Sequence, residues 1–120
     1  MWRLPVIAVF GLAAAVAGAQ IATDTGTGVT VRALDKLTGQ VSDVEIPARQ
    51  SQRVGRIEIT AHECRYPQGN AAGEAYASIT VRENGDDLPA FEGWMIASSP
   101  ALNAMDHPRY DVWVLRCTTS

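Results

Sequence analysis

The sequence of 120 residues lacks several features that usually identify a function. Only one of its ten basic residues, Lys36, is a lysine, and the other nine are arginines that form no cluster. With a formal net charge of −3, this distribution argues against binding to nucleic acid or to an anionic membrane surface. The sequence also has no internal repeat, no acidic tail and no low-complexity linker. It therefore predicts one domain of ordinary size.

Motifs for catalysis are absent as well. There is no G-x-S-x-G element, and the serines, histidines and aspartates do not by themselves indicate a hydrolase, because a triad is defined by geometry. A metal site built on His62-Glu63-Cys64 would need a second pair of ligands that the sequence does not offer. We therefore expect a protein that is not an enzyme and that holds no metal and no cofactor.

The one long apolar run lies at the N-terminus. Arg3 precedes an apolar stretch over 4–17, and the small residues of Ala-Gly-Ala at 17–19 follow it. This is the three-part pattern of a secretory signal peptide. The run is shorter than the roughly 20 residues of a membrane-spanning helix, it contains Pro5, and no cysteine follows it to carry a lipid. We expect residues 1–19 to be cleaved, which leaves a periplasmic chain without a transmembrane span.

Cysteine is scarce, since the chain has only Cys64 and Cys117. Without a C-x-x-C motif a redox-active pair is not indicated. In an exported chain an even number of cysteines indicates disulfides, and two cysteines allow one intramolecular pairing. We predict a bridge from Cys64 to Cys117, with two buried free thiols as the alternative.

Most of the remaining chain consists of short alternating segments. A segment over 20–28, rich in Thr, Gly and Asp, predicts a flexible arm. After it, apolar and polar residues alternate between turn signals that recur every 8–12 residues, which is typical of an all-β protein. The expected strands lie at 29–33, 41–46, 56–60, 74–83, 88–96 and 110–117. They predict a single β-domain over 29–120, a small antiparallel sandwich or barrel.

The positions of the cysteines within these strands predict one irregularity. Ile57 and Ile59 share a face, whereas Cys64 has the opposite parity, so a bulge near 61–63 is needed if all three face the core. Uninterrupted alternation divides the last strand into a face with Trp113, Leu115 and Cys117 and a face with Tyr110, Val112, Val114 and Arg116.

The longest connection precedes the last strand, over 98–110. Pro100 predicts a single helical turn over 100–105, with one of the two preceding serines as N-cap. A connection of this length is usually functional or disordered, and its prolines and the nearby bridge argue against disorder. We predict that this connection and its flanking strands form a recognition surface. The expected contact residues are Trp94, Ser98, Ser99, Met105, His107, Arg109 and Tyr110.

Individual residues of this surface have simpler alternatives. The ring of His107, beside Pro108, can bond to the local backbone instead of a partner. Trp94 and Trp113 can each be core residues.

The same part of the chain resembles a known family. The string comprises Gly93-Trp94-Met95, Ala97 to Leu102, His107-Pro108, Tyr110 to Trp113 and Cys117, with further similarity at Leu34-Asp35-Lys36, Thr38-Gly39, Gly55, Ile57 and Cys64. It resembles the DUF2155 family of small exported alphaproteobacterial proteins. The family usually has a glycine soon after the position of Pro47, where this chain has Ala48-Arg49-Gln50. The resemblance implies export and a β fold, and it implies no reaction.

These observations predict a non-enzymatic periplasmic binding or scaffolding module that contacts a protein partner of the cell envelope through 98–110. The family's association with respiratory-chain genes extends this expectation to an accessory role on an inner-membrane respiratory complex. The alternative is a domain that binds a small ligand or a glycan, with Trp94 stacked on a sugar ring. An exposed Trp94 beside a concave pocket would favour the ligand, and a flat apolar patch would favour a protein.

Overall fold

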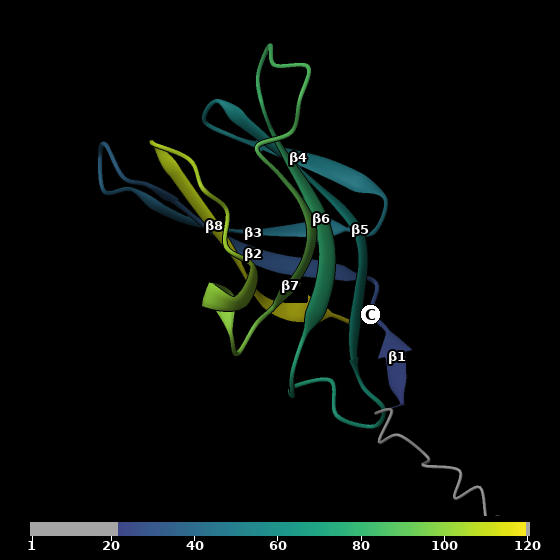
Figure 1. Ribbon diagram of the computed structural model, residues 1–120. Helices are drawn as coiled ribbons and strands as arrows, with labels where there is room; N and C mark the ends of the chain where they lie inside the picture. Colours follow the sequence, from purple (N-terminus) through teal and green to yellow (C-terminus); the bar gives the residue numbers. More distant parts are fainter. Residues whose placement is uncertain (1–21, 120) are drawn as a thin grey trace, which may run out of the picture.

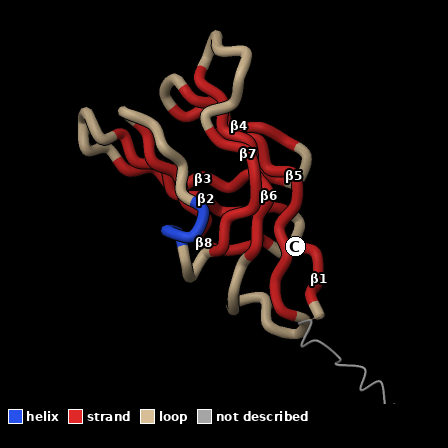
Figure 2. Tube along the Cα trace, viewed as in Figure 1, coloured by secondary structure: helices blue, strands red, loops and turns tan. Residues whose placement is uncertain are grey.

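The computed structural model describes residues 22–119, and the expected signal peptide lies outside this range. Figure 2 shows that strands dominate the chain and that helix is confined to one short turn. The elements are β1 (Thr23–Thr25), β2 (Gly28–Asp35), β3 (Val41–Pro47), β4 (Gln50–Val54), β5 (Ile57–Pro67), β6 (Tyr76–Glu83), β7 (Phe91–Ile96), the 3-10 helix η1 (Pro100–Asn103) and β8 (Tyr110–Thr118). All strand pairs are antiparallel, which confirms the predicted all-β fold with a helical turn in the C-terminal connection.

The strands form two sheets. One has the order β1-β5-β6-β7, with β4 and β1 paired to opposite ends of β5, and the other has the order β3-β2-β8. Figure 1 shows β5 and β6 running across the direction of β2 and β3. The inward side chains of both sheets meet in one core, which includes Val29, Val31, Ile46, Ile57, Ile59, Ile79, Val81, Val112 and Val114. This arrangement is the predicted sandwich.

A bulge in β5 brings Cys64 into this core. The register of β5 against β6 shifts between Ala61 and Glu63, so that His62 is the extra residue. Ile57 and Cys64 are consequently both buried although their positions have opposite parity. The predicted bulge is confirmed.

A second bulge, in β8, corrects the predicted faces of the last strand. Val114 and Arg116 pair with consecutive residues of β2, so Leu115 is skipped. Cys117 therefore shares the inner face, and its predicted grouping with Trp113 is wrong. The buried residues of β8 are Tyr110, Val112, Val114 and Cys117. An alternating sequence pattern reveals a bulge only when residues known to be buried lie on both sides of it and so show that the alternation has shifted.

The two bulges allow the predicted disulfide to form. Cys64 in β5 and Cys117 in β8 are bonded, with their Cα atoms 5.6 Å apart. Since β5 and β8 belong to different sheets, the bridge links the two layers covalently.

The segment before β2 is ordered, which corrects the predicted flexible arm for its described part, 22–28. Thr23–Thr25 pair with β5, and the chain then crosses to the other sheet beside the disulfide. Gly26 N donates to Cys64 O at 2.7 Å. A Cβ on Gly26 would lie 2.8 Å from Thr118 O, so the crossing requires a residue without a side chain. The glycine reflects close packing here.

The predicted hairpin of β2 and β3 is confirmed, with Gly39 at a φ of 79° in its turn. The strand β4 was not among the predicted strands, because its first four residues are polar and exposed and so give no alternating signal. The strand predicted from Leu88 begins only at Phe91, and the side chain of Leu88 is 81% exposed.

The turn into β4 contains a strained residue. Arg49 has a φ of 66° and is the one non-glycine residue with positive φ in the range 22–119. Its N–H donates to Ala61 O at 2.7 Å, which fixes the conformation. A side chain in this left-handed region costs about 1 kcal/mol or more.

Replacing Arg49 by glycine should therefore stabilise the domain. Relief of the strain outweighs the greater freedom of glycine in the unfolded chain, so the free energy of unfolding should rise by about 0.5–1 kcal/mol. Denaturant unfolding measures this, with Arg49→Ala as a control that keeps the strain. A glycine variant less stable than the alanine variant would contradict the assignment.

Candidate functional site

The connection over 98–110 folds back onto the end of the sandwich. The relative exposures of Met105, His107 and Tyr110 are 6%, 8% and 2%. These three side chains lie inside the domain, so their predicted place on an exposed contact surface is wrong. An apolar side chain at 105 and a ring at 110 gain more from burial than from exposure. The sequence pattern of a loop did not show this.

His107 ties the connection to the sheet. Its Nδ1 accepts hydrogen bonds from the backbone N–H groups of Arg109 and Tyr110, both at 3.0 Å. Because Nδ1 accepts, the ring hydrogen is on Nε2, which donates to Glu83 Oε2 at the end of β6 at 3.0 Å. The ring therefore bonds to local backbone, as the alternative for a histidine beside Pro108 predicts.

Arg109 forms an ion pair with Asp35 at the end of β2. Arg109 Nη2 lies 2.9 Å from Asp35 Oδ2, and the guanidinium is 5.2 Å from the ring centroid of Tyr110. The two side chains are 34% and 16% exposed. The hydrogen bond from Arg109 is the largest influence on Asp35; it outweighs desolvation, is aided by the N–H groups of Leu37 and Thr38, and lowers the pKa of the Asp35 carboxyl from its ordinary 3.8 to about 2. Arg109, predicted as a contact residue, is thus engaged within the domain.

Because the pKa of Asp35 is lowered in the folded state, part of the domain's folding stability depends on pH. Because the folded-state pKa of Asp35 is depressed, its contribution is present above about pH 4 and is lost as the pH falls through about 2. Asp35→Asn should lower the melting temperature at pH 6, and the two proteins should converge toward pH 2.

Circular dichroism melts across this pH range measure the effect. Asp106→Asn, at an exposed position of the same connection, is the control and should leave the profile unchanged. A constant difference between Asp35→Asn and wild type at every pH would contradict the role of the ionised carboxylate.

Tyr110 connects the start of β8 with the turn between β4 and β5. Its hydroxyl oxygen accepts a hydrogen bond from Arg56 N at 3.1 Å. Gly55 has a φ of 57°, and a Cβ there would lie 2.5 Å from that oxygen. Glycine at 55 is therefore required by both its backbone conformation and its neighbour. A small cavity beside this contact is lined by Ala33, Asp35, Gln40, Ser42, Val54, Gly55 and Tyr110.

The two serines at the start of the connection also have internal roles. Ser98 donates from its N–H, at 3.0 Å, and from its hydroxyl to the carboxylate of Glu74. Burial opposes the charged form of Glu74, but the bonds from Ser98 and from Ala75 N outweigh it and lower the pKa of the carboxyl. Ser99 occupies the predicted N-cap of η1, with Pro100 following, yet its side chain makes no capping bond.

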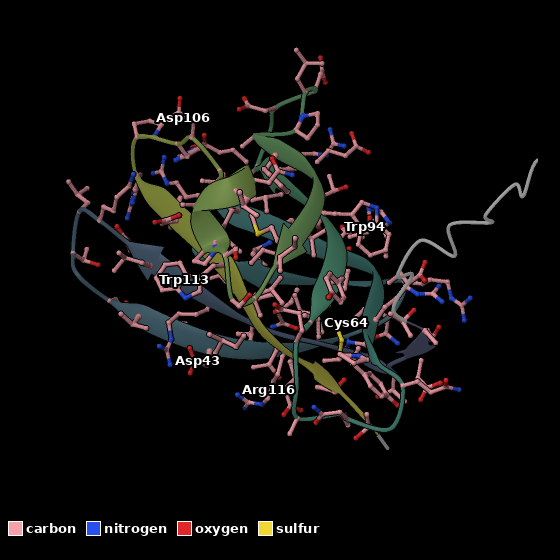
Figure 3. All side chains as sticks on the ribbon, turned by 60° about the horizontal axis from the view of Figure 1, so that its bottom comes forward. Asp43, Cys64, Trp94, Asp106, Trp113 and Arg116 are labelled. Atoms are coloured by element: carbon pink, nitrogen blue, oxygen red, sulfur yellow. A yellow bond between two sulfur atoms is a disulfide. The ribbon has the colours of Figure 1, made fainter. Side chains whose placement is uncertain are left out.

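Two apolar side chains remain on the surface beside this connection. Trp94 is 45% exposed on β7, and Leu102 is 74% exposed on η1. The side chain of Asn103 donates to Trp94 O at 2.8 Å, so η1 is held against β7. Figure 3 shows Trp94 directed outward from its strand. We call these two exposed side chains, which lie on neighbouring elements, the β7–η1 patch.

Trp94 lies on the outer face of its sheet. On the same side of the sheet lies Ile96, two residues along β7 from Trp94. Ile96 pairs with Tyr76 of β6, and both side chains are half-buried. Trp94 lines none of five well-formed hollows within residues 22–119.

Other sequence candidates for chemistry have structural partners. His62 Nε2 lies 2.7 Å from Thr80 Oγ1, and Cys64 is in the disulfide. In the described range 22–119, no group of three or more His, Cys, Asp and Glu side chains could hold a metal ion. Within the same residues no helix has the length and apolar character needed to cross a membrane.

Comparison with known proteins places the chain in a family. No solved structure matches it. An uncharacterized protein of Rickettsia prowazekii is 28% identical over 94 residues, which cover 76% of this chain and 61% of that relative. A family model described as "Uncharacterized protein conserved in bacteria (DUF2155)" matches residues 29–117, from the first core residue of β2 to the bridged cysteine of β8. The chain therefore belongs to the DUF2155 family.

Proposed function

We propose that the protein is a non-enzymatic binding or scaffolding module of the periplasm that contacts a protein partner of the cell envelope. In its most specific form, the proposal is an accessory role on an inner-membrane respiratory complex. The observation that supports binding is the exposure of the β7–η1 patch. Export is supported by the signal-peptide pattern over 1–19 and by the disulfide.

The patch replaces the full 98–110 connection as the proposed contact surface. Arg109 and His107 bind Asp35 and Glu83 inside the domain. The side chains of Trp94 and Leu102, in contrast, are largely exposed. Tryptophan is among the residues that contribute most at protein interfaces. A Trp and a Leu held in place by a hydrogen-bonded helical turn are suited to such a contact.

The shape around Trp94 favours a protein over a glycan or small ligand. Small-molecule sites are concave and bury most of the ligand. Trp94 stands on a strand face between Glu92 and Ile96 and lines none of the identified hollows. A flat surface with apolar side chains is typical of a docking site for another protein.

A double substitution, Trp94→Ala with Leu102→Ser, tests this proposal in cells that export the full-length protein. The melting temperature should stay nearly unchanged because exposed positions contribute within about 0.5 kcal/mol. Recovery of the partner that co-purifies with the wild-type protein should fall about tenfold or more, since interface residues of this kind each contribute 1 kcal/mol or more.

The matched control is Leu37→Ser with Leu88→Ser. These leucines are 76% and 81% exposed on other loops, so the control removes similar apolar area from elsewhere. Loss of the partner in the control but not in the patch variant would refute the assigned surface. Retention of protein partners together with loss of binding to cell-wall glycans would support the glycan alternative instead.

A further inference from the structure

Strand β8 is an open edge of the three-stranded sheet. It pairs only with β2. Lys36 N donates to Arg109 O at 2.7 Å, so by alternation the backbone groups of Asp111 and Trp113 face β2. Those of Val112 and Val114 face away, toward the free edge, and no hydrogen bond within residues 22–119 reaches them.

The corresponding edge of the other sheet is closed. The backbone oxygens of Trp94 and Ile96 point outward from β7, and they accept hydrogen bonds from the side chain of Asn103 and from Ser99 N. Edge strands are usually protected by charges, by proline or by such coverage. The centre of β8, Val-Trp-Val-Leu over 112–115, contains no charged residue and no proline, and η1 lies beside it across a groove without bonding to its backbone.

The side chains of β8 are complementary to a second copy of the same strand. Because Leu115 is skipped in the pairing with β2, consecutive paired positions of β8 are Asp111, Val112, Trp113, Val114 and Arg116. Antiparallel pairing of two copies about a two-fold axis at Trp113 places Asp111 of each copy opposite Arg116 of the other. Asp111 and Arg116 pair with Leu34 and Thr30 of β2, which alternate with the core residues of that strand, so both project from the outer face, although Thr30 itself is covered at 2% exposure. Neither forms an ion pair within residues 22–119, although the pKa of Asp43 is lowered by its hydrogen bond from Arg32 and further by the charge of Arg116.

The backbone groups match in this same register. Val112 of one copy lies opposite Val114 of the other, and these are the residues whose N–H and C=O groups face outward. They form the hydrogen-bonded pairs, while Trp113 meets Trp113 at a non-hydrogen-bonded position, where side chains approach most closely. Charge, backbone and aromatic contacts therefore select one register.

We propose that the protein self-associates through β8, which joins the three-stranded sheets of two copies into one continuous sheet. A groove between η1 and the strand, lined by Pro100, Ala101 and Ala104 on one side, leaves space beside the edge. Figure 3 shows Trp113 and Arg116 along β8, away from Trp94, so self-association leaves Trp94 free. A single strand pair buries less area than most stable complexes, so the dimer is weak and depends on concentration.

Sedimentation velocity of the purified mature protein, from about 1 to 500 µM, tests the proposal over the affinity range of a small interface. The wild type should shift from monomer to dimer as its concentration rises. Asp111→Arg brings two arginines together at each end of the strand pair, and Arg116→Asp does the same with two aspartates. Each single variant should raise the dissociation constant about tenfold, and the double variant, which restores both opposite-charge pairs, should return close to wild type.

Asp106→Arg makes the same charge change at an exposed position off the edge and should dimerise like the wild type. Melting curves show whether each variant is folded. A wild-type protein that stays monomeric throughout the range overturns the proposal. So does a dimer that is indifferent to the single reversals, or folded variants in which the double reversal fails to restore association.

Discussion

Replacing Cys64 and Cys117 together by alanine is expected to lower the free energy of unfolding by about 4 kcal/mol. The bridge closes a loop between residues 53 positions apart, and its removal frees the unfolded chain by about this amount. The bridge is also the one covalent link between side chains of the two sheets within residues 22–119. In a domain of this size the melting temperature should fall by about 15–30 °C.

Thermal melts with and without a reductant measure this effect. Reduced wild-type protein should behave like the alanine variant, and the variant itself should not respond to the reductant. Two free thiols on exported protein, or a variant that melts with the wild type, would contradict the role of the bridge.

Met105→Ala should destabilise the domain by about 2–4 kcal/mol, because it leaves a cavity where a buried side chain packed. Met105 is 6% exposed and belongs to the core, although it lies outside every strand and helix. The expected result is the opposite of what the loop character of 98–110 suggests.

Leu102→Ala is the matched control on the same connection. Its side chain is 74% exposed, so the free energy of unfolding should change by no more than about 0.5 kcal/mol. If Met105→Ala melts like this control, the connection is not part of the core and the β7–η1 patch loses its structural basis.

The strand pattern of this chain was predictable where one face is buried. Alternation identifies β2, β3 and β6, and the parity of Cys64 against Ile57 and Ile59 reveals the bulge at His62. Here buried residues on both sides of the irregularity fix the parity. The bulge at Leu115 was not predictable, because the aromatic and apolar residues of β8 fit either face.

Other errors have a similar physical origin. β4 carries polar residues on an exposed edge, so its pairing is determined by the adjacent β5 rather than by its own composition. The glycines and threonines over 22–28 are typical of a flexible segment, yet at Gly26 the absence of a side chain permits contact with the disulfide-bearing strands.

The candidate site was predictable in position but not in detail. The length and prolines of 98–110 indicate a special connection, and the exposure of Trp94 agrees with its predicted place on the surface. The partners of His107 and Arg109 lie 24 and 74 residues away, so the burial of this polar segment depends on tertiary contacts that local sequence does not contain.

Site-specific photo-crosslinking in intact cells tests most directly whether the β7–η1 patch contacts a protein. A photoreactive phenylalanine analogue replaces Trp94, Leu102, Leu37 or Leu88, one at a time, in the exported protein. We expect positions 94 and 102 to capture the same envelope protein and positions 37 and 88 to capture it weakly or not at all. Crosslinks to that protein from 37 and 88 alone, with none from 94 and 102, would contradict the account.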